Sequence, residues 1–540
     1  MKKSLSLLLA VVMLVSMLAV MGGSALAAED GLELSIQNGS EPNTLDPNAV
    51  NANDTMAKVL HMYEGVMRYA TNGLEVEPGM AESYDVSEDG LTYTFHLRDA
   101  VWSDGEPVTA GDFVYSWQRL VSGGYDNSNF IDMVVNAEDI RNGEADPETL
   151  GVEAVDDHTL VVSLRNPCTY FTQLLAAAVM SPVRQDMVET GDLWYEDPDT
   201  MIGNGPFVLT EWVNQDHITM EANPNYWEAE KVGPSKITWT LMDDDNSILA
   251  SFESGDIMYS NVYPTEELAR LSAEGYVESK LLAGTYYCMI NFDEKNPNYD
   301  VWSNPDVRKA LALAIDRQYI QDVLKVNSGE VAADTFVGPG FLEPDGTDFH
   351  DNSNKWWDNS TYEENLEQAK QLLADAGYPN GEGLPTLAYS TNTGTGHEQI
   401  ATFIQDCWEK LGVTMTIDQL EWAVFLDVRN THDYEVARGG WTADFFDPAS
   451  LMELWITGGG NNDAAYSNPE YDALYKQAQA EPDPAARLAL FHQAEDLLME
   501  DCAVIPIYYY SETYLVKNDE YTGYFDYLGF PMFKYTTTVD

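Results

Sequence analysis

The sequence lacks the short motifs by which most hydrolases and nucleotide-dependent enzymes are recognised. It contains no G-x-S-x-G nucleophile elbow, no H-E-x-x-H zinc pair and no G-x-x-x-x-G-K-[ST] phosphate loop. The segment from Gly394 to His397 begins like a dinucleotide loop, but Gln399 stands where the third glycine belongs. The acidic run 243–246 lacks the glycine turn and terminal glutamate of a calcium loop. We therefore expect a protein without catalytic residues, metal site or cofactor.

Charged and aromatic residues gather in one stretch near the C-terminal third of the chain. Arg429 and Arg438 lie close together beside Trp422 and Trp441, and Asp444 follows. A guanidinium can hold a carboxylate, and an ammonium removed from water requires a carboxylate as its partner. The same residues also fit a plainer role, because arginines in so acidic a chain readily form internal ion pairs and tryptophans commonly pack in cores.

The charge balance is extreme, with 27 Lys and Arg against 90 Asp and Glu and a formal net charge of −63. Nucleic acid is excluded as a partner because phosphate binding requires basic surface. The acidity indicates either a cation-binding site or a solvated acidic coat suited to salty surroundings, where repulsion is screened. Because the acids are scattered along the whole chain, the coat is favoured.

The N-terminus predicts export from the cytoplasm. Lys2 and Lys3 precede an apolar run, and small residues around Ala27 match a signal-peptidase site, so we expect residues 1–28 to be removed. This segment has no cysteine, which argues against a lipid anchor, and the mature chain is expected to be soluble, monomeric and periplasmic or in the cell envelope. Four cysteines are too few for a disulfide scaffold, and their pairing cannot be deduced.

Strand and helix signals alternate along the mature chain. We expect strands at 92–98, 159–164 and 504–510, and helices at 307–324, 361–376 and 484–499. This mixture predicts an α/β protein of several lobes.

Several segments, in the same order, resemble the large extracellular solute-binding proteins for peptides and nickel that serve ABC importers. The most specific is V-W-S-D-G-E-P-V-T-A-G-D-F-V-Y-S-W-Q-R at 101–119, and the others lie at 41–47, 60–67, 78–84, 203–207, 223–227, 304–311, 374–378 and 504–510. The resemblance covers nearly the whole mature chain. It implies a two-lobed (Venus flytrap) fold with an extra domain, and its oligopeptide-binding branch is the most similar.

The resemblance also assigns roles to particular residues. In that branch the aspartate of a W-x-A-D motif grips the peptide α-ammonium, and Asp444 stands at this position. Arg438, Arg429 and His397 are candidates near the peptide C-terminus. Trp441 and Trp422 would line the pockets for peptide side chains, and Tyr115 would also contact the ligand. The segment from Glu41 to Leu45 would run beside the peptide backbone as an extended edge.

The implied organisation has three parts and one hinge. Residues 29–53, 200–283 and 512–540 would form lobe I, residues 54–199 an extra domain packed on it, and residues 284–511 lobe II. The hinge would lie near 283 and 511. Short peptides would bind between the lobes and pass to a permease in the cytoplasmic membrane.

Two departures and two alternatives bear on the ligand. Thr442 and Gly284 replace two cysteines that form a disulfide in that branch, and Met289 replaces a glutamate. Another solute, such as a nickel chelate, haem or an oligosaccharide, is the alternative within the family. A secreted hydrolase is the remote alternative.

Overall fold

The computed structural model describes residues 31–37, 39, 41–325, 328–394, 396–527 and 529–539, so the predicted signal peptide lies outside the described residues. An 11-stranded mixed sheet runs through the molecule in the order β15-β14-β16-β12-β17-β11-β1-β10-β9-β8, with β13 paired to β17. Its strands are β1 (Leu32–Gln37), β8 (Phe207–Val213), β9 (His217–Ala222), β10 (Pro234–Thr240), β11 (Tyr259–Ser260), β12 (Val277–Ile290), β13 (Val331–Ala332), β14 (Leu387–Asn392), β15 (Met415–Leu420), β16 (Val436–Thr442) and β17 (Val504–Val516).

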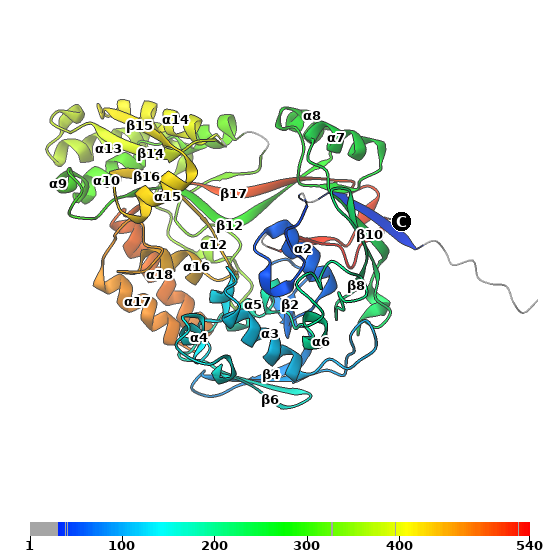
Figure 1. Ribbon diagram of the computed structural model, residues 1–540. Helices are drawn as coiled ribbons and strands as arrows, with labels where there is room; N and C mark the ends of the chain where they lie inside the picture. The colour runs from blue at the N-terminus through cyan, green and yellow to red at the C-terminus, as the bar shows by residue number, and fades with distance from the viewer. Residues whose placement is uncertain are drawn as a thin grey trace, which may run out of the picture.

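The two longest strands, β12 and β17, join the two lobes. Figure 1 shows them crossing from the lobe that carries β14 and β16 to the lobe that carries β8 and β10. They pair antiparallel, but the register shifts between Leu281 and Thr285 and again between Tyr286 and Tyr287. A ladder interrupted in this way lacks some of the hydrogen bonds that stiffen a regular pair of strands.

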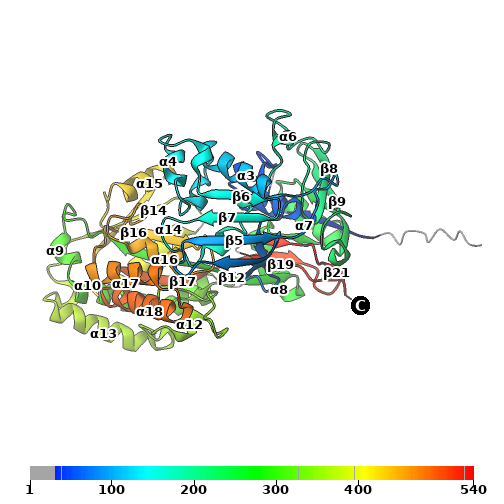
Figure 2. The same cartoon turned by 90° about the horizontal axis from the view of Figure 1, so that it is seen from below.

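A second, antiparallel sheet of order β4-β5-β7-β6 lies at the base of the molecule (Figure 2). It consists of β4 (Ala81–Val86), β5 (Thr92–Leu97), β6 (Val152–Asp156) and β7 (Thr159–Ser163). Helix α3 (Ala110–Ser122) packs near it and begins with a capping box, in which the Asp112 carboxylate accepts the Thr109 backbone N–H at 2.8 Å. Smaller pairings complete the strands: β2 (Met67–Tyr69) with β3 (Val76–Pro78), β18 (Tyr521–Thr522) with β21 (Thr537–Thr538), and β19 (Phe525–Tyr527) with β20 (Phe530–Met532).

Helices cover both lobes. The lobe with β14 and β16 holds α10 (Pro305–Leu313), α13 (Tyr362–Asp375), α14 (His397–Glu409), α15 (Trp422–Asn430), α17 (Pro469–Ala480) and α18 (Pro484–Glu500), with short α9 (Tyr299–Trp302), α11 (Arg317–Tyr319), α12 (Phe349–Asn352) and α16 (Ala449–Met452). Elsewhere lie α2 (Asn53–Met62), α4 (Ala137–Arg141), α5 (Phe171–Leu174), α6 (Gln185–Val188), α7 (Asp245–Ser254) and α8 (Leu268–Glu274). In the described residues, no helix combines the length and apolarity needed to cross a membrane.

Most predicted elements are confirmed, with two differences. The strands at 92–98 and 159–164 and the helices at 361–376 and 484–499 are present with shifts of a few residues. The expected helix 307–324 is broken, because α10 ends at Leu313 and the chain resumes as α11 and a π-helical turn at 320–324. The strand expected at 504–510 continues to Val516, so that one strand serves both lobes.

Candidate functional site

Arg438 lies on β16 in an aromatic setting that lacks an acidic partner. Arg438 is 9% exposed. Its guanidinium lies 5.2 Å from the Tyr286 ring centroid, and its Nη2 donates to the Tyr510 hydroxyl at 3.1 Å. Among the described residues, no carboxylate forms an ion pair with Arg438 and its buried Nε has no hydrogen-bond partner. A buried cation of this kind is a costly arrangement unless an anion arrives.

His397 joins the same cluster from the first turn of α14. Its ring centroid lies 5.6 Å from that of Tyr286, and Tyr286 stacks on Tyr508 at 4.7 Å. Burial first, and then the charges of Arg438 and Lys325, lower the pKa of His397 to about 4. The imidazole is therefore neutral at pH 7 and able to donate one hydrogen bond to an anion beside Arg438.

Arg429 has a different environment, although it lies nine residues before Arg438. Its residue is 6% exposed, and its guanidinium forms an ion pair with Asp463, with Nε donating to Oδ2 at 3.0 Å. The sequence left two roles open for Arg429, ligand contact and internal ion pair. Its contacts in the structure are those of an internal ion pair. Its charge still reaches Tyr287 and Tyr510, beside the Arg438 cluster.

Asp444 follows the end of β16 and carries the opposite charge. Its backbone N–H donates to the Ser450 hydroxyl at 2.9 Å, and in the described residues its carboxylate forms no ion pair. The residue is exposed to solvent, yet the surrounding protein raises the pKa of its carboxyl by desolvation, which outweighs the opposing effect of Ser450 and Trp441. Trp441 is half-buried and lies next to this carboxylate.

Glu453 is a second carboxylate that sequence reasoning missed. It lies in the short 3-10 turn Glu453–Trp455 after α16, and no cation forms an ion pair with it among the described residues. Burial first, and then the charge of Asp444, raise the pKa of Glu453 to about 7. No sequence motif identifies this glutamate. The only sequence signal is that it lies three residues after Ser450, whose hydroxyl accepts a hydrogen bond from the Asp444 backbone.

The site also includes tyrosines that the sequence analysis did not single out. Tyr508 and Tyr510 alternate along β17 and surround Arg438 together with Tyr286 of β12. The period-2 spacing of the Y-Y-Y run at 508–510 is the signal that would have placed two of them on one face of a strand.

The expected aromatic contacts lie at separate places. Trp422 begins α15 and is 47% exposed, with its ring 6.1 Å from Phe425, so it is free to meet a ligand. Tyr115 is half-buried on α3, near the ion pair of Arg119 with Asp46. The structure therefore brings Arg438 close to His397 and Asp444 close to Trp441. Among the described residues, no hydrogen bond or ring contact joins Trp422 or Tyr115 to either pair.

The segment from Glu41 to Leu45 is not a strand but an irregular segment. The Glu41 carboxylate accepts from the Trp212 indole at 2.8 Å and from the Gln215 backbone N–H at 2.5 Å, and the Leu45 side chain is fully buried. These two side chains anchor the segment. Within the described residues, no backbone-to-backbone hydrogen bond joins residues 41–45 to another segment.

The departures from the family pattern have clear structural settings. Gly284 and Thr442 are directly opposite each other in the β12–β16 ladder, so cysteines at these positions could be bridged. Met289 is 2% exposed and packs in the core. All four cysteines of this chain are buried and free.

Groups of opposite charge thus lie near one strand. The cation Arg438, surrounded by tyrosines, occupies the middle of β16, and the carboxylates Asp444 and Glu453 follow the end of this strand. In the described part of the chain, no group of three or more His, Cys, Asp or Glu residues is arranged to hold a metal ion. The arrangement suits a ligand with one anionic and one cationic end.

Comparison with known proteins places the chain in a family. The model described as bacterial extracellular solute-binding proteins, family 5 middle, matches residues 75–463. The dipeptide-binding protein DppE of Bacillus subtilis is 34% identical over 91% of this chain and 89% of its own length. The periplasmic oligopeptide-binding protein OppA of Salmonella typhimurium is 35% identical over 96% of this chain and 94% of its own length.

Solved structures show the same relationship. The unliganded open form of the murein tripeptide-binding protein MppA superposes with a TM-score of 0.82 at 31% identity, covering 93% of this chain and 97% of that one. Haemophilus influenzae OppA in complex with RPPGFSPFR gives a TM-score of 0.69 at 30% identity, covering 95% and 100%. The chain therefore belongs to family 5 of the bacterial extracellular solute-binding proteins.

Proposed function

We propose that this protein captures short peptides by their charged ends and delivers them to an ABC importer. The observation that carries the proposal is the pair of unmatched charges along β16. Among the described residues, Arg438 has no carboxylate partner and Asp444 has no cation partner. A zwitterionic peptide would supply both missing charges, and each charge-assisted bond contributes about 1.5–3 kcal/mol.

The spacing of the two charges fits a peptide of a few residues. Arg438 and Asp444 are six residues apart and β16 ends at Thr442, so their Cα atoms are separated by at most about 20 Å. An extended peptide of a few residues has a length of the same order.

The segment 41–45 would supply the contacts that every peptide shares. Its backbone groups are not used by another described backbone segment, and its side chains at Glu41 and Leu45 are held by the protein. A peptide backbone could pair with it as an added strand, which requires no particular side chain in the ligand. The exposed Trp422 and the half-buried Trp441 and Tyr115 would contact peptide side chains.

Closure of the lobes would bury the peptide. We propose lobes at 29–53 with 200–283 and 512–540, and at 284–511, with an extra domain at 54–199. The register break in β12 and β17 near Leu281 is a suitable hinge, and the higher TM-score with an unliganded open form than with a peptide complex fits an open state. Peptide contacts with both lobes would shift the population toward the closed state.

The alternatives have less support. A metal chelate or haem receptor would leave the Asp444 and Arg438 charges without partners. For a hydrolase, Ser353 Oγ does lie 3.1 Å from His492 Nδ1, and His492 Nε2 lies 2.8 Å from Glu343. However, Ser353 is 8% exposed and its hydroxyl also donates to Glu495 at 2.8 Å, so packing explains this chain of bonds.

The remaining parts of the proposal concern location and partners. The predicted signal peptide and the periplasmic relatives support an extracytoplasmic location. We propose that the protein acts there as a monomer and meets a permease at the cytoplasmic membrane. The decisive experiment is native mass spectrometry of the purified protein. We expect co-purified masses that fragment as peptides of a few residues. Bound species that yield no amino-acid fragments, or a protein that binds no added tripeptide, would contradict the proposal.

A further inference from the structure

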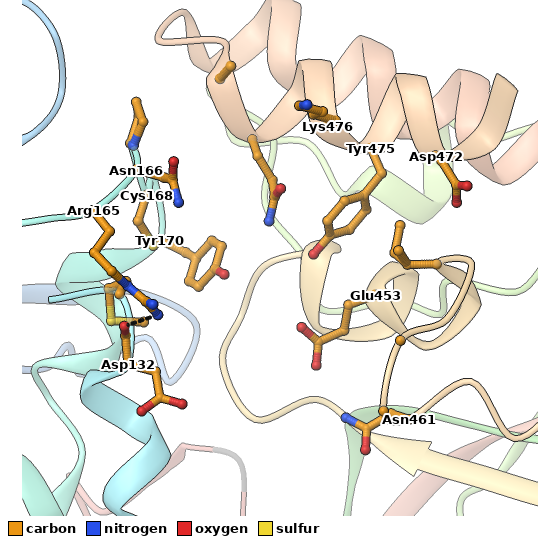
Figure 3. Close-up of a pocket in the computed structure, with 17 residues that line it drawn as sticks. Asp132, Arg165, Asn166, Cys168, Tyr170, Glu453, Asn461, Asp472, Tyr475 and Lys476 are labelled. Atoms are coloured by element: carbon orange, nitrogen blue, oxygen red, sulfur yellow. Dashed lines mark hydrogen bonds between the residues drawn. The ribbon is translucent and has the colours of Figure 1, made fainter. Parts of the chain in front are cut away.

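A large cavity opens beside the carboxylate end of the site, between the extra domain and the opposing lobe. Its volume is about 930 Å³, and Figure 3 shows side chains from both walls pointing into it. One wall comes from the chain after β7 and includes Tyr170. The other comes from the turn at Glu453 and from Tyr475 on α17.

The lining of the cavity is suited to a cation. Tyr475 is 5% exposed, lines the cavity and points into it (Figure 3). The Glu453 carboxylate lies close enough to act electrostatically on the hydroxyls of both Tyr170 and Tyr475. A carboxylate between two aromatic rings combines ion pairing with cation–π attraction.

The basic residues of the lining do not cancel this carboxylate. Arg165 pairs with Glu138 at 2.7 Å, and Lys476, which lines the cavity from α17, is exposed to solvent and forms no ion pair with Glu453 among the described residues. Asp472, which also lines the cavity, adds negative charge. The cavity therefore contains an acidic, aromatic corner at Glu453.

This corner adjoins the residue that would hold the peptide ammonium. Asp444 raises the energy of a charged Glu453, so the two carboxylates are electrostatic neighbours. Phe445, the residue after Asp444, stacks on Tyr170 with ring centroids 4.3 Å apart. The side chain of the first peptide residue leaves the same Cα atom that carries the ammonium, and so it starts next to the cavity.

We propose that Glu453, Tyr475 and Tyr170 form a subsite for a basic side chain, Arg or Lys, at the first position of the bound peptide. The inference rests on the proposed function and adds a sequence preference to it. A guanidinium or ammonium would give Glu453 the cation that it lacks and would accept the π faces of the two tyrosines.

The test compares tripeptides that differ at one group. Isothermal titration calorimetry of ligand-stripped protein with Arg-Ala-Ala, citrulline-Ala-Ala and Ala-Ala-Ala separates charge from size, because citrulline is a neutral analogue of arginine. We expect Arg-Ala-Ala to bind about tenfold more tightly than citrulline-Ala-Ala. In Glu453→Gln this preference should fall to within about twofold, while binding of Ala-Ala-Ala stays within about threefold of the wild type.

Controls keep the outcomes distinct. Glu470→Gln removes an exposed charge of the same helix as Tyr475 outside the cavity lining and should retain the preference. Tyr475→Leu, which removes the aromatic face, provides a second variant if Glu453→Gln fails to fold, and it should weaken the preference in part. Equal affinities for the arginine and citrulline peptides, with Ala-Ala-Ala still bound, would overturn the inference alone. A wild type that binds none of the three would overturn the proposed function.

Discussion

At the scale of single residues, Arg429 and Arg438 show what a sequence leaves undecided. Both are buried arginines from one stretch of the chain, yet Arg429 pairs with Asp463 whereas Arg438 faces tyrosines. The partner Asp463 lies in a loop 34 residues beyond Arg429, and no local pattern predicts that contact. Sequence reasoning could therefore name both arginines as candidates but could not separate them.

This difference predicts opposite consequences of the same substitution. Arg429→Met should lower the free energy of unfolding by about 3 kcal/mol, because it leaves the Asp463 carboxylate without its partner. Arg438→Met should leave the stability of the ligand-free protein unchanged or higher, since it removes an unpaired buried cation. Urea denaturation measures the first effect. Tripeptide titration should show that Arg438→Met loses affinity for free peptides and no longer distinguishes them from C-terminal amides.

Asp444 carries the other end of the proposed contact. Asp444→Ala should weaken tripeptide binding by about 2 kcal/mol or more, because the peptide ammonium would be buried without a carboxylate. Calorimetry with free and N-acetylated forms of one tripeptide gives the measurement. The wild type should strongly prefer the free form and the variant should not. An acetylated peptide that binds the wild type as well as its free form does would refute the role of Asp444.

At the scale of elements, local sequence patterns predicted the helices and strands correctly where the pattern of buried residues and the capping residues indicate the same element. The run at 92–97 alternates inward and outward as its pattern predicted, and α13 and α18 lie within a few residues of the predicted limits. The segment 305–324 is broken after Leu313, and beyond the break Arg317 is buried, where its Nε donates to the Pro506 carbonyl at 2.6 Å. That contact joins residues far apart in sequence, which periodicity does not report.

The strand β17 also contains a titrating group near the proposed hinge. Burial first, and then the charge of Asp526, raise the pKa of Glu512 to about 7, although Lys280, its partner across the ladder, opposes the shift. A carboxyl whose pKa is raised on folding favours the folded state most at low pH. This stabilisation is lost as the pH rises from about 4.5 to about 7, by at most about 3 kcal/mol.

We therefore expect the wild type to be less stable at pH 8 than at pH 5.5, and Glu512→Gln to lose less stability over the same interval. Chemical denaturation at the two pH values measures both changes. Glu520→Gln, an exposed carboxylate on the same segment, serves as the matched control and should follow the wild type. An identical pH dependence in wild type and Glu512→Gln would show that Glu512 does not titrate in this way.

At the scale of the whole molecule, the family and the two-lobed architecture were accessible from the sequence, because motifs spread along the chain resemble one family. Side-chain partners were not. The cavity at Glu453 lies between segments about 280 residues apart, 165–170 and 453–480, and only the fold brings them together. A ligand preference that depends on such a cavity could not be read from either segment alone.

The net charge of −63 makes the stability of this fold sensitive to salt. Most of the acids lie on the surface, where like charges repel over about 10 Å at 0.1 M salt and over about 3 Å at 1 M. The melting temperature should therefore rise between 0.05 M and 1 M NaCl. Sulfate would also strengthen apolar burial, so NaCl and KCl are the appropriate salts. A melting temperature that does not change over this range would show that the acidic coat adds no measurable repulsion to the folded state, and the saline interpretation of the composition would then be wrong.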